Sequence, residues 1–334
     1  MEVKTDILIP NISYIKYIKI KYFLFLKRVR VTLSKISLLL PTRGRKNLLE
    51  RLFDSFHQTT SDLSLVEIVM CIDDDDAATQ RMTFDPVFNV KKIIGKRSTM
   101  GTYNTKCLEH SSGDIIILFN DDVVVRTKDW DKMIIDFDAK HPDKIYLAYV
   151  NDLFKKKKVG SFPILSRKTC DVVKDPFPSP YKGEHIDYHL FDIFKRLSVK
   201  GYERIHYFED TVFEHMHFSQ GKASFDQTYL DRKMYSDDEV FVAYSPNRRN
   251  AAERLVSVIQ GKSLPKITES PRIFPAGPDH GYIRTLYASF IKDRSLPFFW
   301  RLKLFLWFSW RFFAKQGKLL WIKKLVYATR KQGR

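Results

Sequence analysis

The sequence predicts an α/β fold with a mostly parallel central sheet flanked by helices. Apolar runs typical of buried strands, such as Ile36–Leu40 and Asp114–Phe119, alternate with segments whose apolar residues recur at helical spacing. Two of the runs end in clustered acidic residues, at Asp73–Asp76 and at Asp121 and Asp122. Open α/β sheets bind their ligands at the carboxyl ends of their strands, so these tips indicate a functional edge.

The expected elements alternate along the chain. In the first half we expect strands at Ile36–Leu40, Leu65–Ile72, Val90–Ile94 and Asp114–Phe119, with a helix carrying Leu48, Leu49, Leu52, Phe53 and Phe56 and another at Thr102–His110. In the second half we expect helices at Trp130–Ala139 and Asp187–Ser198 and strands at Ile145–Val150, Ile205–Phe208 and Thr211–Phe213. Gly261–His280 is proline-rich without periodicity and is predicted to be a surface linker.

Positive charge is concentrated at the two ends of the chain. The net charge is +18, and residues 7–46 and 295–334 each contain ten Lys/Arg and no acidic residue. The remaining residues carry nearly equal numbers of basic and acidic side chains. We therefore expect a basic extension at 1–35, a catalytic domain at 36–245, a helical or linker region at 246–294, and a basic aromatic tail at 295–334.

The tail has the pattern of a helix that lies in a membrane interface. Its apolar arc comprises Phe298, Leu302, Phe305, Leu306, Ser309, Phe312 and Phe313, and most of its basic residues fall outside that arc. We expect this tail, helped by Tyr14–Val31, to bind an anionic membrane surface. Packing on the body or on a second copy of the chain is the alternative, so a homo-oligomer stays open. We do not expect the basic ends to bind nucleic acid, because apolar residues interrupt their basic residues.

The cellular location expected from the sequence is the cytoplasm, at the inner face of the cell membrane. Cys71, Cys107 and Cys170 match no disulfide framework or zinc motif, which favours a reducing compartment. Tyr22–Leu26 is too short for the core of an export signal, and Leu304–Trp310 is too short to span a bilayer.

The pair Asp121 and Asp122 is the most informative feature of the chain. Two adjacent carboxylates at the tip of a buried strand can hold a divalent cation through direct oxygen bonds and leave positions for a substrate diphosphate. His215 and His217, which would point to one side of an extended segment, could add a nitrogen ligand to an ion such as Mn²⁺. The alternatives are an acidic turn and structural histidines.

Other clusters favour a phosphate-bearing ligand at the same edge. One carboxylate of Asp73–Asp76 could accept hydrogen bonds from a base or a ribose, and another could cap a helix. Arg43 and Arg45 follow the first strand, and Lys106 lies on the helix before the acidic pair, where positive charge would offset a diphosphate. Asp187 and Asp192 begin a helix and could act as a general base or as helix caps.

The order of these features resembles the GT-A glycosyltransferases, in particular the inverting family-2-like enzymes. The stretches that carry the resemblance lie between residues 36 and 235: Ile36–Arg45, Ile68–Asp76, Met100–Asn104, Gly113–Asp122, Asp192–Leu197 with Gly201 and Tyr202, and Val212–His217. The ordered set is more specific than any one motif.

The resemblance implies a role for each matched residue. The nucleotide-sugar pocket would comprise Pro41, Thr42, Arg43, Arg45, Asp73, Asp74, Gly101, Asn104, Lys106, Asn120 and Asp121. Asp122, with Asp121, would hold a divalent cation (Mn²⁺ or Mg²⁺), and His215 or His217 would complete its shell. The base would be Asp192 or, failing that, Asp187. The acceptor would be a lipid-linked saccharide or a surface polysaccharide.

Two positions depart from the pattern of that family. Asn120 stands where the D-x-D element begins with aspartate, which shifts the metal role to Asp121 and Asp122. The family's Glu-Asp pair would align near His189 and Leu190, which is why the base moves to a neighbouring aspartate. An inactive transferase fold that serves as a membrane scaffold, and a sugar nucleotidyltransferase, remain the alternative functions.

Overall fold

A computed structural model describes residues 34–223, 235–267, 270–271 and 281–317. The chain divides into residues 1–33, which lie outside the described residues, and one compact unit that begins at Ser34. The predicted contribution of Tyr14–Val31 to membrane binding therefore falls outside the described residues, as does the part of the tail beyond residue 317.

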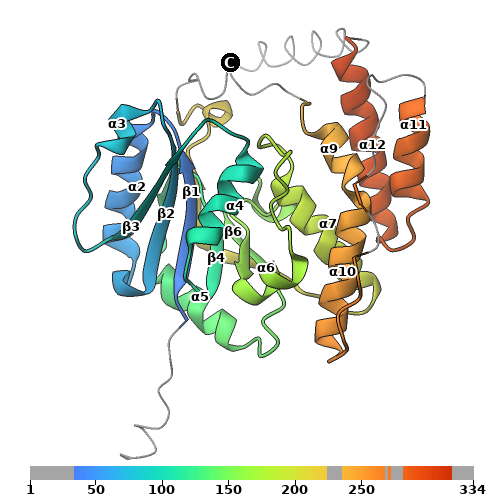
Figure 1. The fold of residues 1–334 in the computed structure, drawn as a ribbon, viewed down its shortest axis with the longest axis horizontal. Coiled ribbons are helices and arrows are strands. Elements are labelled where there is room, and N and C mark those ends of the chain that lie inside the picture. Colours follow the sequence, from blue (N-terminus) through green and yellow to red (C-terminus); the bar gives the residue numbers. More distant parts are fainter. Residues whose placement is uncertain (1–33, 224–234, 268–269, 272–280, 318–334) are drawn as a thin grey trace, which may run out of the picture. The chain divides into compact units, whose positions relative to one another are not determined.

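The unit is built on an eight-stranded sheet, which confirms the predicted α/β class (Figure 1). In sequence order the strands are β1 (Ile36–Thr42), β2 (Val66–Asp73), β3 (Asn89–Gly95), β4 (Ile115–Leu118), β5 (Val123–Val125), β6 (Leu147–Asn151), β7 (Ile164–Ser166) and β8 (Ile205–His215). Their order across the sheet is β3-β2-β1-β4-β7-β6-β8-β5.

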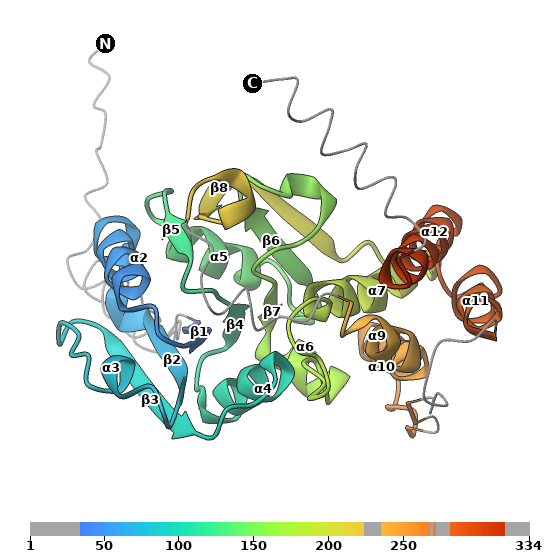
Figure 2. The same cartoon turned by 90° about the horizontal axis from the view of Figure 1, so that it is seen from above.

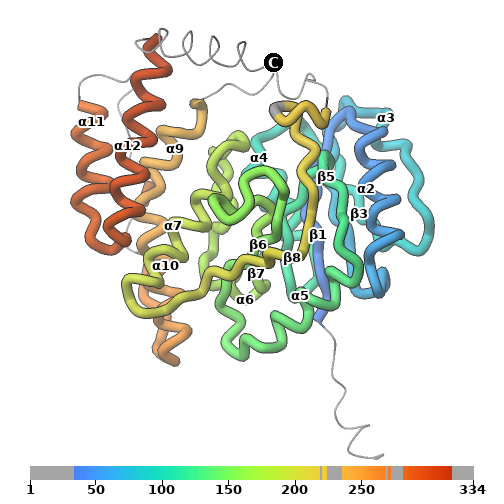
Figure 3. Tube along the Cα trace, turned by 180° about the vertical axis from the view of Figure 1, so that it is seen from behind, coloured from blue at the N-terminus to red at the C-terminus, as the bar shows by residue number. Residues whose placement is uncertain are grey.

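The direction of the strands determines which loops share an edge. Strands β3, β2, β1 and β4 are parallel, and β6 pairs in parallel with β8. Strands β7 and β5 run antiparallel to their neighbours. The carboxyl ends of β1, β2, β4, β6 and β8 therefore meet at one edge, together with the start of β7. Figure 3 shows β8 from behind, running along β6 to that edge.

Helices cover both faces of the sheet. The longer ones near the sheet are α2 (Lys46–Thr59), α4 (Met100–His110), α5 (Trp130–Ala139), α6 (Arg167–Val173) and α7 (Ile186–Val199), and a short α3 (Ala77–Gln80) follows β2. Figure 2 shows α2 and α5 on one side of the sheet and α4 and α6 on the other. Two buried apolar clusters correspond to these two faces. Strand β1 contributes side chains to both clusters, because successive residues point to opposite faces of the sheet. Leu38 lies in one cluster and Leu39 in the other.

Side chains cap the starts of α3, α4 and α6. Thr99 caps α4 by accepting a hydrogen bond from the Thr102 N–H, and Ser166 caps α6 through Thr169 in the same way. Asp76 caps α3, so one member of the acidic run has the capping role expected as an alternative. The first turn of α4 approaches the loop before α7 so closely that only glycine fits at Gly101, where a Cβ would lie 2.0 Å from the carbonyl oxygen of Pro178.

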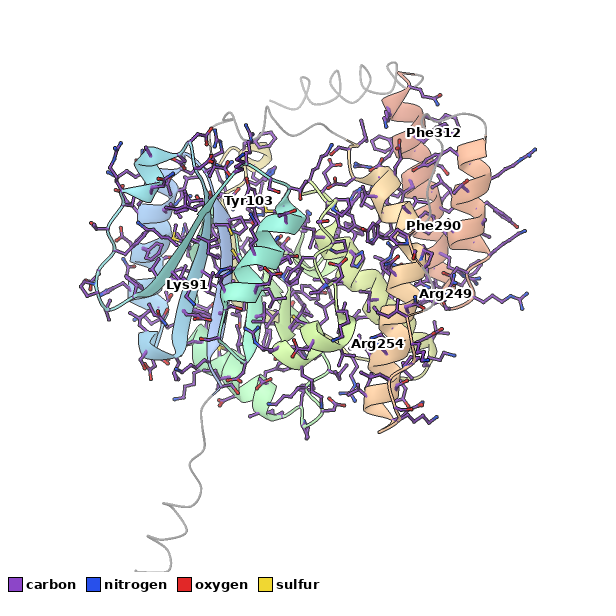
Figure 4. The ribbon with its side chains drawn as sticks, in the orientation of Figure 1. Lys91, Tyr103, Arg249, Arg254, Phe290 and Phe312 are labelled. Carbon is purple, nitrogen blue, oxygen red and sulfur yellow. The ribbon has the colours of Figure 1, made fainter. Side chains whose placement is uncertain are left out.

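The last helices share the core of the sheet domain. They are α9 (Asp238–Ala243), α10 (Ser245–Ile259), α11 (Gly281–Leu286) with the π-helical turn η4 (Tyr287–Ile291), and α12 (Phe298–Lys315). Buried residues of α10, α11 and α12 belong to the same apolar cluster as α7. Figure 4 labels Phe290 and Phe312 within this group of helices. Up to residue 317, the regions expected at 246–294 and 295–334 are therefore continuous with the catalytic domain.

Several elements differ from those expected. The two short strands near residues 205 and 213 form the single eleven-residue strand β8. Strands β5 and β7 have three residues each, too few to show a period. Helix α10 buries Arg248 and Arg254, so its inward face does not appear apolar in the sequence. The expected linker at 261–280 has no regular structure over residues 262–267, and part of it lies outside the described residues.

Candidate active site

A cavity of about 530 Å³ lies at the carboxyl edge of the sheet. Of the predicted site residues, it is lined by Pro41, Thr42, Arg43, Arg45, Asp73, Asn104, Asn120, Asp121, Asp122, Asp187, His215 and His217. These residues come from β1, β2, α4, α7, β8 and the segment after β4, which are far apart in the sequence. The fold therefore brings most of the predicted residues to one place.

The turn after β1 is held by the acidic tip of β2. Arg43 donates to Asp73 at 2.7 Å and, through its second nitrogen, to Asp75 at 2.8 Å. Tyr103, which Figure 4 labels on α4, donates its hydroxyl to the other oxygen of Asp73. Burial and this acceptor raise the pKa of Tyr103, so the phenol keeps its proton. Asp73 is thus oriented from two sides at the wall of the cavity.

The first acidic residue after β4, Asp121, forms a second buried ion pair. Asp121 accepts from Arg45 at 2.7 Å and from the Thr42 hydroxyl at 2.8 Å. Burial raises the pKa of Asp121, and the neighbouring Arg45 opposes that rise. Both carboxylate oxygens of Asp121 have protein partners, so this residue is suited to orienting Arg45 and the turn after β1.

Asp122 faces the end of β8. Its Oδ1 atom lies 3.2 Å from Nε2 of His215, and both side chains are buried. Backbone pairing fixes this contact, because Val123 is in register with His215 and the Met216 N–H donates to the Asp122 carbonyl. His217 lies on the same side, with its ring stacked on Phe154 at 5.3 Å.

The Asp122 and His215 pair fits a divalent cation. A carboxylate oxygen and an imidazole nitrogen are both ligands that Mn²⁺ accepts. Two atoms that bind one ion at about 2.1 Å and at right angles lie about 3 Å apart, and the observed separation is 3.2 Å. Asp121 fits this role less well than expected, because Arg45 and Thr42 already occupy its oxygens.

A second group of potential metal ligands lies beside the cavity. Glu184, His185 and Asp238 have ligand atoms within 4.8 Å of one another. Arg311 of α12 donates to Asp238 at 2.8 Å and to Glu184 at 2.7 Å. A guanidinium therefore already supplies the positive charge between these carboxylates. This cluster attaches α12 to the loop that precedes α7.

The two aspartates of α7 lie in different places. Asp187 lines the cavity, accepts a hydrogen bond from its own helix at the Tyr188 N–H, and lies 3.6 Å from Nζ of Lys155. Asp192 is fully buried and accepts from Arg248 at 2.7 Å, Arg196 at 2.9 Å and the Trp300 indole at 3.0 Å. Because Asp192 cannot reach an acceptor hydroxyl, we correct its expected role as the base and regard it as a structural residue.

Three other expected residues do not line the cavity. Asp74 is exposed, and its backbone N–H bonds the Gly95 carbonyl. Gly101 is needed for close packing against Pro178, as described above. Lys106 lies one turn along α4 with its ammonium group near Gly95, not at the cavity wall. Asp74 and Gly101 are each adjacent in the sequence to a lining residue, and Lys106 lies two residues after one, but all three face another direction.

The cavity also contains residues that the sequence did not suggest. Arg97 and Thr99 follow the end of β3, and Phe154 and Lys155 follow β6. The rule that open α/β sheets bind ligands at the carboxyl ends of their strands (the strand-end rule) would have found them if it had been applied to every strand. Ser161, Phe162 and Pro163 precede β7. Because β7 is antiparallel, its start and not its end lies at this edge, and this arrangement could not be read from the sequence.

Comparison with known proteins supports the architecture. No protein-family model and no curated protein matches the chain. Among solved structures, S. aureus TarS (residues 1–349) in complex with UDP-GlcNAc has a TM-score of 0.50 at 12% identity and covers 79% of this chain and 82% of its own. The chain has a GT-A-like fold. At this identity the likeness concerns the fold alone.

Two further structures are similar at lower scores. TarS in complex with UDP has a TM-score of 0.44 at 13% identity and covers 67% of this chain and 83% of its own. The mannosyltransferase PcManGT from Pyrobaculum calidifontis, in complex with GDP-Man and Mn²⁺, has a TM-score of 0.43 at 12% identity. The match covers 96% of this chain and 90% of the PcManGT chain.

Proposed function

We propose that this protein is a metal-dependent, inverting glycosyltransferase that moves a sugar from a nucleotide-sugar donor to an acceptor hydroxyl. One observation carries the proposal: the Asp122 and His215 pair, 3.2 Å apart, lies in a cavity that also contains ion-paired arginines and the carboxylate of Asp187. TarS and PcManGT, whose solved complexes contain nucleotide sugars, point to the same class of donor.

The donor would occupy the half of the cavity formed by β1, β2 and α4. Asp73, oriented by Arg43 and Tyr103, is suited to accept hydrogen bonds from a base or a ribose hydroxyl. Arg45 would face the diphosphate, with its position maintained by Asp121. Pro41, Thr42, Asn104 and Asn120 complete this wall.

Asp122 and His215, with His217 nearby, would hold Mn²⁺ or Mg²⁺. The bound ion would supply positive charge that stabilises the departing nucleoside diphosphate. The buried position of both side chains, fixed by pairing between β5 and β8, keeps these ligands oriented.

Asp187 would serve as the general base. It lies on α7, which packs against β6, whereas the proposed donor residues lie at β1 and β2, on the other side of β4 and β7 in the sheet. A base on the opposite side of the sugar from the diphosphate deprotonates the attacking hydroxyl, so a single displacement inverts the anomeric centre. Lys155 lies 3.6 Å from the Asp187 carboxylate and places a positive charge beside it.

The acceptor we propose is a lipid-linked saccharide or a surface polysaccharide, reached from the cytoplasmic side of a membrane. In the described part of the chain no helix combines the length and apolar character needed to cross a bilayer. Helix α12 instead has two apolar faces: Trp300, Leu304, Phe308 and Phe312 are buried, whereas Phe298, Phe299, Leu302, Leu306, Trp310 and Phe313 are exposed.

We propose that the exposed face of α12 rests on an anionic lipid surface. This face differs from the arc expected from the sequence, because Phe312 points into the protein and Phe305 packs beside Tyr287. Of its four basic residues, Arg311 and Lys315 pair with carboxylates of the protein, whereas Arg301 and Lys303 form no ion pair within the described residues and are complementary to anionic lipid. Phe299 is 82% exposed, which is unfavourable in water.

A thermal-stability screen tests the proposed function. The protein is heated with UDP-, GDP-, CMP- or dTDP-sugars, each with and without Mn²⁺. We expect one nucleotide sugar to raise the melting temperature only with the metal, and we expect Asp122→Ala to abolish both this shift and sugar transfer. Asp74→Ala, an exposed carboxylate at the same edge, is the matched control. No shift with any donor would favour the inactive scaffold.

A further inference from the structure

The loop between β6 and β7 contains four consecutive lysines, Lys155–Lys158, at the border of the cavity. The two ends of the loop form cavity wall, since Phe154 and Lys155 line it on one side and Phe162 on the other. Lys156, Lys157 and Lys158 lie between these ends and are exposed. The lysine run is therefore part of the rim of the proposed active site.

The backbone of this loop is rigidly organised around Asp152. This carboxylate is buried and accepts the backbone N–H groups of Phe154 at 2.9 Å, Lys155 at 2.8 Å and Lys156 at 2.7 Å. Its second oxygen accepts the Ser161 hydroxyl at 2.7 Å, which closes the base of the loop. The lysines are thus presented from a fixed platform.

The loop also contains unfavourable backbone conformations. Leu153, Lys156 and Phe162 have φ angles of 53°, 50° and 56°, in the left-handed region that non-glycine residues seldom adopt. Conformations of this kind persist where surrounding contacts enforce them, and they cluster at functional sites. The contacts of Asp152 provide that enforcement here.

The positive charge of the loop is not neutralised within the described residues. Lys155 pairs with Asp187, and the arginines of the donor half, Arg43 and Arg45, pair with carboxylates. In the described ranges Lys156, Lys157 and Lys158 form no ion pair. Three uncompensated ammonium groups therefore border the cavity on the side of the candidate base.

These lysines are too far from the Asp73 wall of the cavity to serve the base or the ribose of the donor. Between β2, which carries Asp73, and β6, which precedes the loop, the sheet order places β1, β4 and β7. Four strand spacings of about 4.8 Å separate the two strands by about 19 Å. The lysines instead lie on the same side as Asp187, where an acceptor chain would leave the cavity.

We propose that the acceptor is an acidic saccharide chain, with phosphate or carboxylate groups spaced along it, and that Lys156, Lys157 and Lys158 bind those groups. Lysine is a mobile point charge, so three on one turn attract a polyanion without demanding one geometry, in contrast to a bidentate arginine. This inference rests on the proposed function, since it names the substrate class of the same cavity.

Footprinting of lysines in the full-length protein tests the inference. The protein, without added metal or nucleotide, is acetylated with and without short-chain inorganic polyphosphate, and the rate at each lysine is followed by mass spectrometry. We expect about a tenfold slower reaction at Lys156, Lys157 and Lys158 when polyphosphate is present at about ten times its dissociation constant, because only the unoccupied fraction of the loop reacts. The protection should disappear at high salt.

Three exposed lysines outside the carboxyl edge, Lys128, Lys132 and Lys140, are the internal control. Their rates should change less than twofold, and equal protection of both sets, or none, would overturn the inference. Polygalacturonate replaces polyphosphate to test carboxylates, and dextran should protect nothing. Protection by phosphatidylglycerol vesicles but not by either polyanion would show that the loop faces lipid, and would also overturn it.

The substitution K156Q/K157Q/K158Q provides a second measurement, with K128Q/K132Q/K140Q as its matched control. At a constant concentration of free Mn²⁺, inhibition of sugar transfer by polyphosphate should weaken about tenfold in the first variant, which loses three surface ion pairs of about 0.5 kcal/mol each, and stay unchanged in the second. Equal inhibition of both would contradict the inference. The nucleotide-sugar screen is run on the same preparations: if no donor stabilises the protein, the proposed function fails, whereas the footprint still reports whether the loop binds polyanions.

Discussion

Asp187 and Asp192 lie five residues apart on α7 and occupy opposite environments. Asp187 is at the wall of the cavity, with Lys155 as its nearest cation at 3.6 Å. Asp192 is fully buried and receives hydrogen bonds from two arginines and an indole. In the sequence both are aspartates at the start of an amphipathic helix.

The difference between these residues shows what separates a reactive carboxylate from a structural one. Asp192 joins α7 to α10 through Arg248 and to α12 through Trp300, so it holds three helices together. Among the described residues, Asp187 bonds to no other helix, and it lines the cavity. We therefore expect substitutions at Asp192 to change the free energy of unfolding and those at Asp187 to change turnover.

The largest effect is expected for Asp192→Ala. This change leaves Arg248 and Arg196 buried without their shared counter-charge, which should lower the free energy of unfolding by about 3–5 kcal/mol. Urea denaturation followed by circular dichroism would measure it. Asp187→Ala, on the same helix, should cost less than about 1 kcal/mol. Equal losses in the two variants would remove the distinction between them.

Asp187→Asn should have the next largest effect, and on turnover alone. Removal of a general base typically slows a reaction by 10²-fold or more, which corresponds to about 3 kcal/mol. Donor stabilisation by the nucleotide sugar should persist, because Asp187 lies on the acceptor side. Steady-state rates with the donor identified by the screen would measure this. Asp136→Asn, an exposed position on α5, is the control, and normal turnover of Asp187→Asn would assign the base elsewhere.

The acid dependence of stability gives a smaller effect. Burial alone would raise the pKa of Asp192, but Arg196 and Arg248 outweigh it and lower the pKa to about 2. Because this pKa is lower than in the unfolded chain, ionised Asp192 stabilises the folded state by about 2.5 kcal/mol in total. This contribution is complete above about pH 4 and is lost as the pH falls through 2. The stability difference between the wild type and Asp192→Asn should therefore shrink by about 1 kcal/mol between pH 6 and pH 3. A constant difference would contradict the lowered pKa.

Much of the fold could be predicted because its signals are local. Buried strands such as β1 and β2 are continuous apolar runs, and α2 and α4 have clear helical spacing. Strands β5 and β7 could not be predicted, since three residues show no period and their pairing depends on distant partners. Residues 246–294 were expected to be helical or a linker, and the bounds of α10 could not be predicted because its inward face uses Arg248, whose charge is compensated by Asp192 on another helix.

The candidate site was predictable where the strand-end rule applies. Asp73, Asp121 and Asp122 end parallel strands and line the cavity, as expected. The rule does not give the direction of a side chain, so it could not separate Asp73 from exposed Asp74. It also could not separate Asp187 from Asp192, because the partners of Asp192 come from residues 248 and 300, far along the chain.

Helix α12 shows the same contrast between a structural and an exposed face, and here the predicted effect is on membrane binding and not on stability. Leu306 and Trp310 are 57% and 47% exposed, so Leu306→Gln with Trp310→Gln should leave the melting temperature unchanged. If this face enters an anionic membrane, the double variant should lose about 2 kcal/mol of binding, or about thirtyfold in affinity for phosphatidylglycerol vesicles in a flotation assay.

The matched control for α12 is Val87→Gln with Ile94→Gln, which removes two exposed apolar side chains near the edge strand β3. This variant should float like the wild type. Loss of binding in both variants would indicate a general effect of surface polarity. If neither loses binding, but Leu306→Gln with Trp310→Gln converts a dimer into a monomer in sedimentation, then a second copy of the chain, and not lipid, covers this face. The buried stripe at Trp300 would keep its structural role in each case, because it contacts Asp192 within the same chain.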